Sequence, residues 1–174
     1  MNQKALETAI RQDLISSLPA GWTLPIILGN QPTGQGREDG IYFFRISDGK
    51  PGWQGRKYRD LPGALELKET QWTESTYQFQ ALVQDDLDDD EQLLAADALS
   101  IVRSTVSGIV MVEKLIRRGI GVQRPTDIIT PAFINDQDQF DYNPNFTISF
   151  SHRREITQSV PYTEVVTEEG IHRV

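Results

Sequence analysis

The densest group of potential metal ligands in this chain is one acidic run, Asp85-Asp86-Leu87-Asp88-Asp89-Asp90-Glu91. Asp86, Asp88 and Asp90 stand at alternate positions, which is the spacing of the first ligands in a calcium-binding loop. Such a loop also needs glycine at its sixth position and glutamate at its twelfth, where this chain has Glu91 and Asp97. We therefore interpret the run as a solvated turn that opens a helix, because acidic side chains stabilise a helix N-terminus.

Clustered acidic residues could bind the metal ion of a small metal-dependent hydrolase. Such an enzyme needs carboxylates gathered at one edge of a sheet, or a histidine beside a nucleophile. The acids here are bunched in one local run instead. The chain also has no Walker loop, nucleotide-binding glycine fingerprint or nucleophile elbow. We predict no catalytic residue, no bound metal and no cofactor, and we keep the hydrolase as an alternative.

The histidines, His152 and His172, give no stronger indication of catalysis. His152 follows the alternating apolar residues of a predicted strand that includes Phe146 and Phe150, so we expect a half-buried structural side chain. Its neighbour Ser151 would lie on the opposite face of that strand and could not form a dyad with it. The chain has no cysteine, so thiolate metal sites and disulfides are excluded.

A second group of side chains is basic and aromatic, and comprises Lys50, Trp53, Arg56, Lys57, Tyr58 and Arg59. These residues could bind nucleic acid, with cations on phosphates and rings stacked on bases. They could instead contact an acidic patch on a neighbouring identical subunit, because opposite charges on identical subunits complement each other. They could also form a solvated loop. Because the chain is acidic, we favour the second interpretation over the first and predict an interface here.

The composition fits one domain and disfavours a protein that coats nucleic acid. The chain has 174 residues, 38% of them hydrophobic, with a net charge of −8 and a pI near 4.7. Nucleic-acid coats need a basic face. The N-terminus has no apolar run of the signal-peptide type, and no stretch approaches the roughly 20 residues of a spanning helix. We expect one domain over residues 1–166 and a C-terminal tail over residues 167–174.

Hydrophobic periodicity and Gly/Pro positions indicate the elements that would position these residues. We predict helices over residues 3–18, from 88–90 to 104, and over 109–117, with a break at 104–108. We predict strands within residues 22–28, 41–46, 64–83, 120–124, 146–156 and 161–166. The segment 64–83 could be one very long strand or two joined by a bend. Residues 47–63 should form a long projecting hairpin loop, and residues 125–141 a second loop.

The strand near Tyr77 shows which face of the sheet is buried. Tyr77, Phe79 and Ala81 alternate with Gln78 and Gln80, which is the pattern of a strand with one apolar face. The following helix has an apolar stripe that would pack on that face. The sequence therefore predicts an α/β (α+β) fold, with an antiparallel or mixed sheet flanked on one face by helices.

In this order of elements the chain resembles the phage neck and tail-terminator proteins of contractile-tailed viruses. The resemblance is carried by the strand at residues 72–81, the helix at 90–99 and the closing segment at 146–155, which ends in a polar, arginine-containing stretch. It covers about residues 5–166.

The resemblance implies a structural virion protein rather than an enzyme. It implies a ring of subunits, commonly a hexamer, that caps the tail tube and sheath and joins them to the head-side connector. DNA would pass through the ring without sequence-specific binding, and assembly would take place in the host cytoplasm, with no membrane involved. An acidic lumen would not grip DNA, and edge strands with a projecting arm suit β-augmentation between subunits. Another tail-completion protein or a baseplate adaptor is the alternative from the same class.

Overall fold

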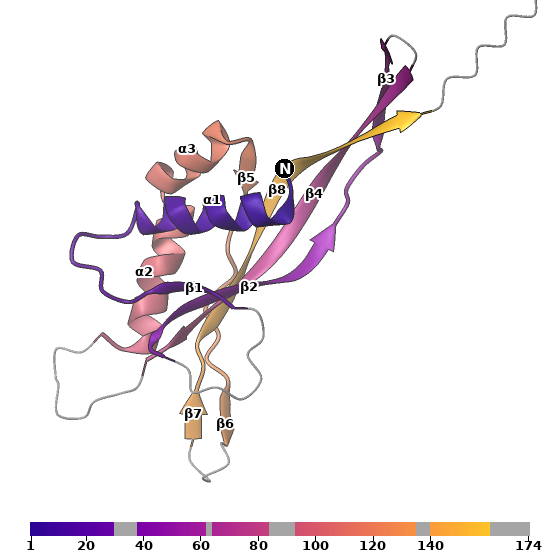
Figure 1. The fold of residues 1–174 in the computed structure, drawn as a ribbon. Helices are drawn as coiled ribbons and strands as arrows, with labels where there is room; N and C mark the ends of the chain where they lie inside the picture. The colour runs from indigo at the N-terminus through magenta and orange to yellow at the C-terminus, as the bar shows by residue number, and fades with distance from the viewer. Residues whose placement is uncertain (30–37, 62–63, 84–92, 135–139, 161–174) are drawn as a thin grey trace, which may run out of the picture.

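A mixed sheet with three helices on one face makes up the part of the chain that the computed structural model describes, residues 1–29, 38–61, 64–83, 93–134 and 140–160 (Figure 1). The elements in chain order are α1 (Gln3–Ile15), β1 (Ile26–Leu28), β2 (Gly40–Gly49), β3 (Gly55–Leu61), β4 (Ala64–Leu82), α2 (Ala95–Ser107), α3 (Ile109–Arg117), β5 (Ile120–Val122), β6 (Ala132–Ile134), β7 (Phe140–Tyr142) and β8 (Asn145–Val160).

The sheet is organised around the long strand β4. The strand order is β1-β2-β4-β8-β5, with β1 parallel to β2 and the other pairs antiparallel. One edge of β4 pairs with β8 along nearly its whole length, from Leu65 to Gln80. Its other edge pairs first with β3 and then with β2. The strands β6 and β7 form a separate two-stranded sheet.

The core lies between the three helices and the body of the sheet. The sheet contributes stacked rings from three neighbouring strands, with centroids 5.3 Å apart for Phe43 and Phe79 and 5.1 Å apart for Phe79 and Phe146. Each helix contributes the buried side of an amphipathic pattern, as Leu6, Ile10 and Leu14 do in α1. Burying this aromatic and aliphatic surface is the main force that holds the helices on the sheet.

Local signals explain where the helices begin and end. The Asn2 side chain accepts a hydrogen bond from the Ala5 amide at 2.8 Å and so caps α1. At Gly108 the backbone turns from helical to extended, which separates α2 from α3. Gly119 takes a φ of +76°, a conformation that favours glycine, immediately after α3.

The predicted fold class is confirmed, whereas several element boundaries are corrected. The segment 64–83 is one strand, β4, rather than two. The first described turn of α2 begins at Ala95, not near Asp88–Asp90, and its N-cap residue Leu94 makes no side-chain cap. The predicted loop at 125–141 contains β6 and β7, because strands of three residues are too short to give a periodic signal. The acidic run at 85–91, the predicted strand at 161–166 and the tail at 167–174 lie outside the described residues.

No single helix among the described residues is long and apolar enough to cross a membrane. The pair α2 and α3 passes by length and composition when taken together, with a 50° bend between the two helices. Both helices bury side chains in the protein core, including Leu99, Val102, Met111 and Leu115.

Candidate functional site

The most distinctive feature of the fold is an arm that extends the sheet beyond the helices (Figure 1). We define the arm as β3, residues 64–71 of β4 and residues 153–160 of β8. The β3–β4 pairing runs from Gly55↔Thr70 to Leu61↔Ala64, and β8 continues alongside as far as Leu65↔Val160. The arm is thus three ordered strands, and the prediction of one long loop over residues 47–63 is not confirmed.

The six predicted interface residues all lie on or beside the arm, but they do not form one patch. Lys50 and Trp53 lie in the segment before β3, and Trp53 is 99% exposed. The other four are consecutive in β3, so their side chains alternate between the two faces of the arm. Arg56 and Tyr58 share one face, whereas Lys57 and Arg59 share the other. The six residues form one group only if the segment is a loop, because side chains of a loop do not alternate between two faces.

One face of the arm continues the core-facing side of the sheet without any helix covering it, and it combines apolar side chains with an ion pair between Arg56 and Glu69 at 3.0 Å. The register places Tyr58 opposite Leu67 and Leu65 opposite Val160, and these side chains share the parity of the buried Tyr77 and Phe79. Tyr58 is 61% exposed and Ile156, on the same face, is 40% exposed. The sequence reading missed this surface because a short, weak alternation gives little signal without knowledge of the register.

The opposite face of the arm is charged. Lys68 forms an ion pair with Glu155 at 2.8 Å, and Lys57 stands directly opposite Lys68 in the register. The carboxyl pKa of Glu155 is lowered, first by the hydrogen bond from Lys68 and also by the charge of Arg153. Arg59, next to this pair, is opposite Glu66. This face therefore carries charges of both signs around an excess of cations.

Both edges of the arm are open among the described residues. The strand β3 pairs with β4 alone, and β5 covers β8 only from Phe150 to His152, so residues 153–160 have one unpaired edge. An unpaired edge presents a row of backbone N–H and C=O groups that can add a further strand. The arm can therefore accept a strand on either side.

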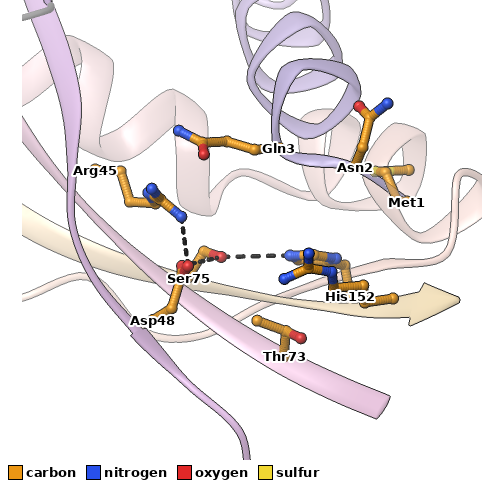
Figure 2. A pocket seen from close by; sticks show the side chains of 9 residues that line it. Met1, Asn2, Gln3, Arg45, Asp48, Thr73, Ser75 and His152 are labelled. Carbon is orange, nitrogen blue, oxygen red and sulfur yellow. Dashed lines mark hydrogen bonds and ion pairs between the residues drawn. The ribbon is translucent and has the colours of Figure 1, made fainter. Parts of the chain in front are cut away.

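A small polar pocket lies at the base of the arm, under the N-terminus of α1 (Figure 2). Its volume is about 120 Å³, and it is lined by Met1, Asn2, Gln3, Arg45, Asp48, Thr73, Ser75, His152 and Arg154. The core-facing side of β4 changes here from aromatic to polar, because Tyr77 is followed toward the arm by Ser75 and Thr73. A β-bulge between Arg45 and Ser47 shifts the register of β2, so that Arg45 and Asp48 both face the pocket.

Three pocket side chains form a hydrogen-bonded line from β2 to β8. The Ser75 hydroxyl donates to Asp48 Oδ1 at 2.7 Å, and Ser75 Oγ lies 3.3 Å from His152 Nε2. Asp48 also forms an ion pair with Arg45. In a hydrolytic triad the histidine stands between the acid and the nucleophile, whereas here the serine stands between the other two. The line therefore does not have the arrangement of a hydrolytic triad.

His152 is buried, with 4% of its surface exposed, rather than half-buried as the sequence suggested. Burial lowers its pKa, and the nearby positive charges of the N-terminal amino group and Arg154 lower it further, against the opposing effect of Asp48. A neutral ring is therefore favoured near pH 7. Its hydrogen-bonding partner is Ser75, not the adjacent Ser151. Ser75 could not be identified from the sequence, because it comes close to His152 only through the pairing of β4 with β8.

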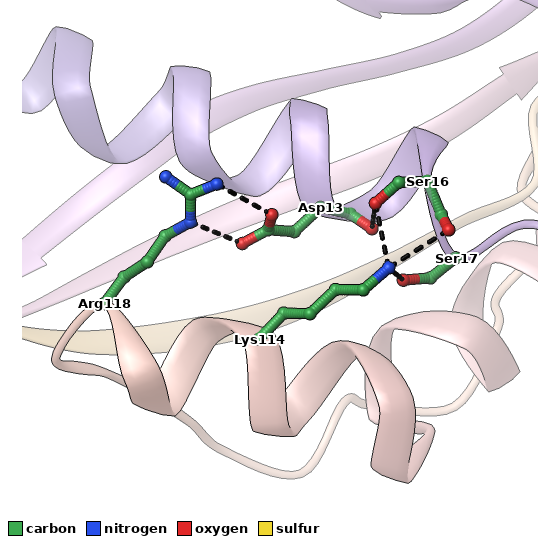
Figure 3. Close-up of polar contacts among 5 residues, drawn as sticks. All are labelled: Asp13, Ser16, Ser17, Lys114 and Arg118. Atoms are coloured by element: carbon green, nitrogen blue, oxygen red, sulfur yellow. Dashed lines mark hydrogen bonds and ion pairs between the residues drawn. The ribbon is translucent and has the colours of Figure 1, made fainter.

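An α1–α3 contact fixes the other end of the N-terminal helix, away from this pocket (Figure 3). Arg118 donates from Nε to Asp13 Oδ2 at 2.9 Å and from Nη2 to Asp13 Oδ1 at 3.0 Å. Lys114 Nζ donates to the Ser16 carbonyl at 3.0 Å and to the Ser17 hydroxyl at 2.9 Å. These bonds connect the C-terminal half of α1 to α3. Among the described residues, no cluster of histidine and acidic side chains could hold a metal ion.

Comparison with known proteins gives a family match and similar solved structures. A family model described as the E217 gateway protein gp29 matches residues 5–162. Among solved structures, the sheath/tube terminator of an extracellular contractile injection system, PVC, in its extended state is similar, with a TM-score of 0.51 and 11% sequence identity. That likeness covers 100% of this chain but 64% of the terminator, and it shows a shared fold. No curated protein matches the chain.

Proposed function

Since the chain belongs to the family of the phage E217 gateway protein gp29, we propose that it is a structural protein of a phage tail, which closes into a ring at the neck or tail terminus. The observation that carries this proposal is the arm, in which a sheet with open edges and an uncovered, partly apolar face extends beyond its helices. A surface of this kind is stabilised when another protein covers it.

The occupant that we propose for the arm is a second copy of the same chain. The open edge of β3 spans seven residues and that of β8 spans residues 153–160, so edges of similar length lie on opposite sides of one arm. If β3 of one subunit pairs with β8 of the next, each contact is head to tail, and such contacts close into a ring when the rotation permits. The subunit number that we propose is six.

The charge distribution supports the same arrangement. The chain has a net charge of −8, while the arm has six Lys and Arg residues, among them Arg56, Lys57 and Arg59, against four Asp and Glu residues. A basic arm is attracted to an acidic neighbour, and an acidic lumen allows DNA to pass without holding it. In this proposal the ring caps the tail tube and sheath, contacts the head-side connector and forms part of the virion after assembly in the host cytoplasm.

Charge reversal on the arm tests the proposed interface. We expect Arg56→Glu, Lys57→Glu and Arg59→Glu together to weaken self-assembly and to change its dependence on salt. A matched control reverses Lys4, Arg117 and Arg124, which are exposed and lie outside the arm, and produces the same change in net charge. Sedimentation velocity at several salt concentrations gives the assembled fraction. Equal effects of the two triple variants on the assembled fraction would show that the arm is not part of the interface.

Binding to tail tubes tests the proposed location. The gold-labelled protein is mixed with tail tubes of its own phage and viewed by electron microscopy. We expect label at one end of each tube, because a terminator recognises the last subunit ring. Label along the tube walls, or no label on tubes, would contradict the proposal.

A further inference from the structure

We propose that the pocket at the base of the arm is a binding site for one carboxylate group. The group can belong to a small free acid or to an acidic side chain of another protein chain. This inference concerns the pocket lined by Thr73, Ser75 and His152 and does not depend on ring assembly.

The pocket is lined by two residues that carry buried polar atoms without partners in the described chain. Thr73 Oγ1 and His152 Nδ1 make no hydrogen bond within the described chain, and both residues are only 4% exposed. Burying such atoms unpaired is costly, because they lose their bonds to water and gain nothing in return. Both side chains line the same pocket, so a group bound there lies beside both of them.

The N-terminus of α1 lies at the pocket. The Asn2 side chain caps the Ala5 amide and the Asn2 carbonyl accepts from Leu6, which leaves the amides of Gln3 and Lys4 without helical acceptors. Asn2 and Gln3 line the pocket. Free amides at a helix N-terminus, together with the helix dipole, favour a negatively charged group.

The charged groups that line the pocket are mostly positive. Asp48 already has partners in Arg45 and Ser75. Arg154 lines the pocket and forms no ion pair among the described residues, and the amino group of Met1 is close enough to affect the histidine. The charges that remain uncompensated are therefore positive. A carboxylate balances them, whereas a cation adds to them.

Binding of a carboxylate at this pocket is coupled to protonation of the His152 ring. The Ser75 hydroxyl donates to Asp48, so His152 Nε2–H donates to Ser75 Oγ, and Nδ1 of the neutral ring carries a lone pair. That lone pair would repel a carboxylate. Binding therefore requires that Nδ1 take up a proton, after which it donates to the ligand. Affinity should rise as the pH falls below neutral, since the protonated ring is then easier to form.

The size of the pocket limits the ligand. A volume of about 120 Å³ accepts a carboxylate on a short stem and excludes a nucleotide or a sugar phosphate. The acidic run at residues 85–91 of another copy is one source of such groups in this sequence. Acetate represents a free acid, and a peptide with the sequence of residues 84–92 represents an acidic segment.

The test is a titration of His152 by NMR in the full-length chain with isotope-labelled histidine. We expect saturating sodium acetate or the peptide to raise the His152 pKa by about one pH unit relative to sodium chloride at equal ionic strength. His172 serves as the internal reference. A response to acetate alone identifies a small acid, and a response to the peptide alone identifies an acidic segment; both support the site.

Two arginine variants make the test specific. Arg154→Gln should reduce the acetate or peptide response at least several-fold, because Arg154 lines the pocket. Arg153→Gln is the matched control, since Arg153 is the neighbouring exposed residue and pairs with Glu155 on the opposite face. Dispersed amide spectra establish that both variants are folded. No shift of the His152 titration with either probe, or equal responses of the two variants, would overturn the proposal.

Discussion

Removal of the Arg118 side chain should destabilise the protein much more than removal of its neighbour Arg117. Arg118 makes two charge-assisted hydrogen bonds to Asp13, at 2.9 and 3.0 Å, and the Asp13 side chain is only 7% exposed (Figure 3). Arg118→Ala therefore leaves a buried carboxylate without its cation. Arg117 is 78% exposed and pairs with Glu113 at 3.5 Å on the helix surface, so its truncation leaves no buried charge.

The expected magnitude follows from these exposures. Breaking a fully buried ion pair costs about 3–5 kcal/mol. Arg118 is itself 46% exposed, so water can partly solvate the Asp13 carboxylate, and we expect a loss of about 2 kcal/mol. For a chain of this size that corresponds to a fall in Tm of about 4–8 °C. Truncation of a surface pair such as Arg117–Glu113 should cost about 0.5 kcal/mol or less.

Urea unfolding followed by circular dichroism measures both variants under the same conditions. A double variant, Asp13→Ala with Arg118→Ala, should cost less than the sum of its two single variants, because the second change removes the charge that the first left unpaired. Equal losses for Arg118→Ala and Arg117→Ala, or full additivity in the double variant, would refute the role given to this contact.

Three further predictions concern the core, a close backbone approach and the buried histidine. Phe79→Ala should lower the free energy of unfolding by about 3–5 kcal/mol in urea titrations, since Phe79 is fully buried between two stacked rings, whereas exposed Trp53→Ala should change it by less than about 0.5 kcal/mol. Gly40→Ala should cost about 1–3 kcal/mol, because the new Cβ would lie 3.0 Å from a backbone oxygen, while Gly29→Ala should cost less, its Cβ meeting nothing closer than 3.7 Å; thermal melts compare the two. The lowered pKa of His152 means that the unfolded chain binds the proton first, so stability should fall as the pH drops below about 6.5, and His152→Asn should show a smaller fall between about pH 8 and pH 5.5 in urea midpoints.

The body of the sheet could be predicted from the sequence because its buried apolar residues alternate with polar residues along each strand. Tyr77, Phe79 and Ala81 are all buried on one face, as are Phe146 and Phe150 on the partner strand. Apolar residues that recur at every second position over many residues indicate a strand with one apolar face. The fold class followed from that pattern and is confirmed. The resemblance to phage neck and tail-terminator proteins rested on the order of the elements and on three segments, and it is confirmed as well.

The arm could not be predicted in the same way. Glycine and proline between Gly49 and Gly63 indicated a loop, and local preference does favour one there. The pairing of β3 with β4 overrides that preference, since alternate residues of β3 exchange backbone hydrogen bonds with β4 along the hairpin. Once the segment is a strand, Arg56 and Lys57 point to opposite faces, and the single basic patch divides into two.

The pocket, like the arm, could not be predicted from the sequence. Asp48, Ser75 and His152 belong to three strands, and Ser75 and His152 are 77 residues apart. Their meeting depends on the register of β4 with β8 and on a bulge in β2, neither of which leaves a signal in composition or spacing. The start of α2 was placed too early because acidic residues mark helix N-termini, and the first described turn begins instead at Ala95.

The most direct test of the proposed ring is the mass of the full-length protein in solution. Light scattering behind size exclusion over a concentration series gives that mass independently of molecular shape. The proposal predicts one discrete mass of a closed ring, six subunits of 19.7 kDa each, either for the protein alone or after addition of tail tubes. A chain that remains monomeric at every concentration, and that still gives no ring on tail tubes, would contradict it.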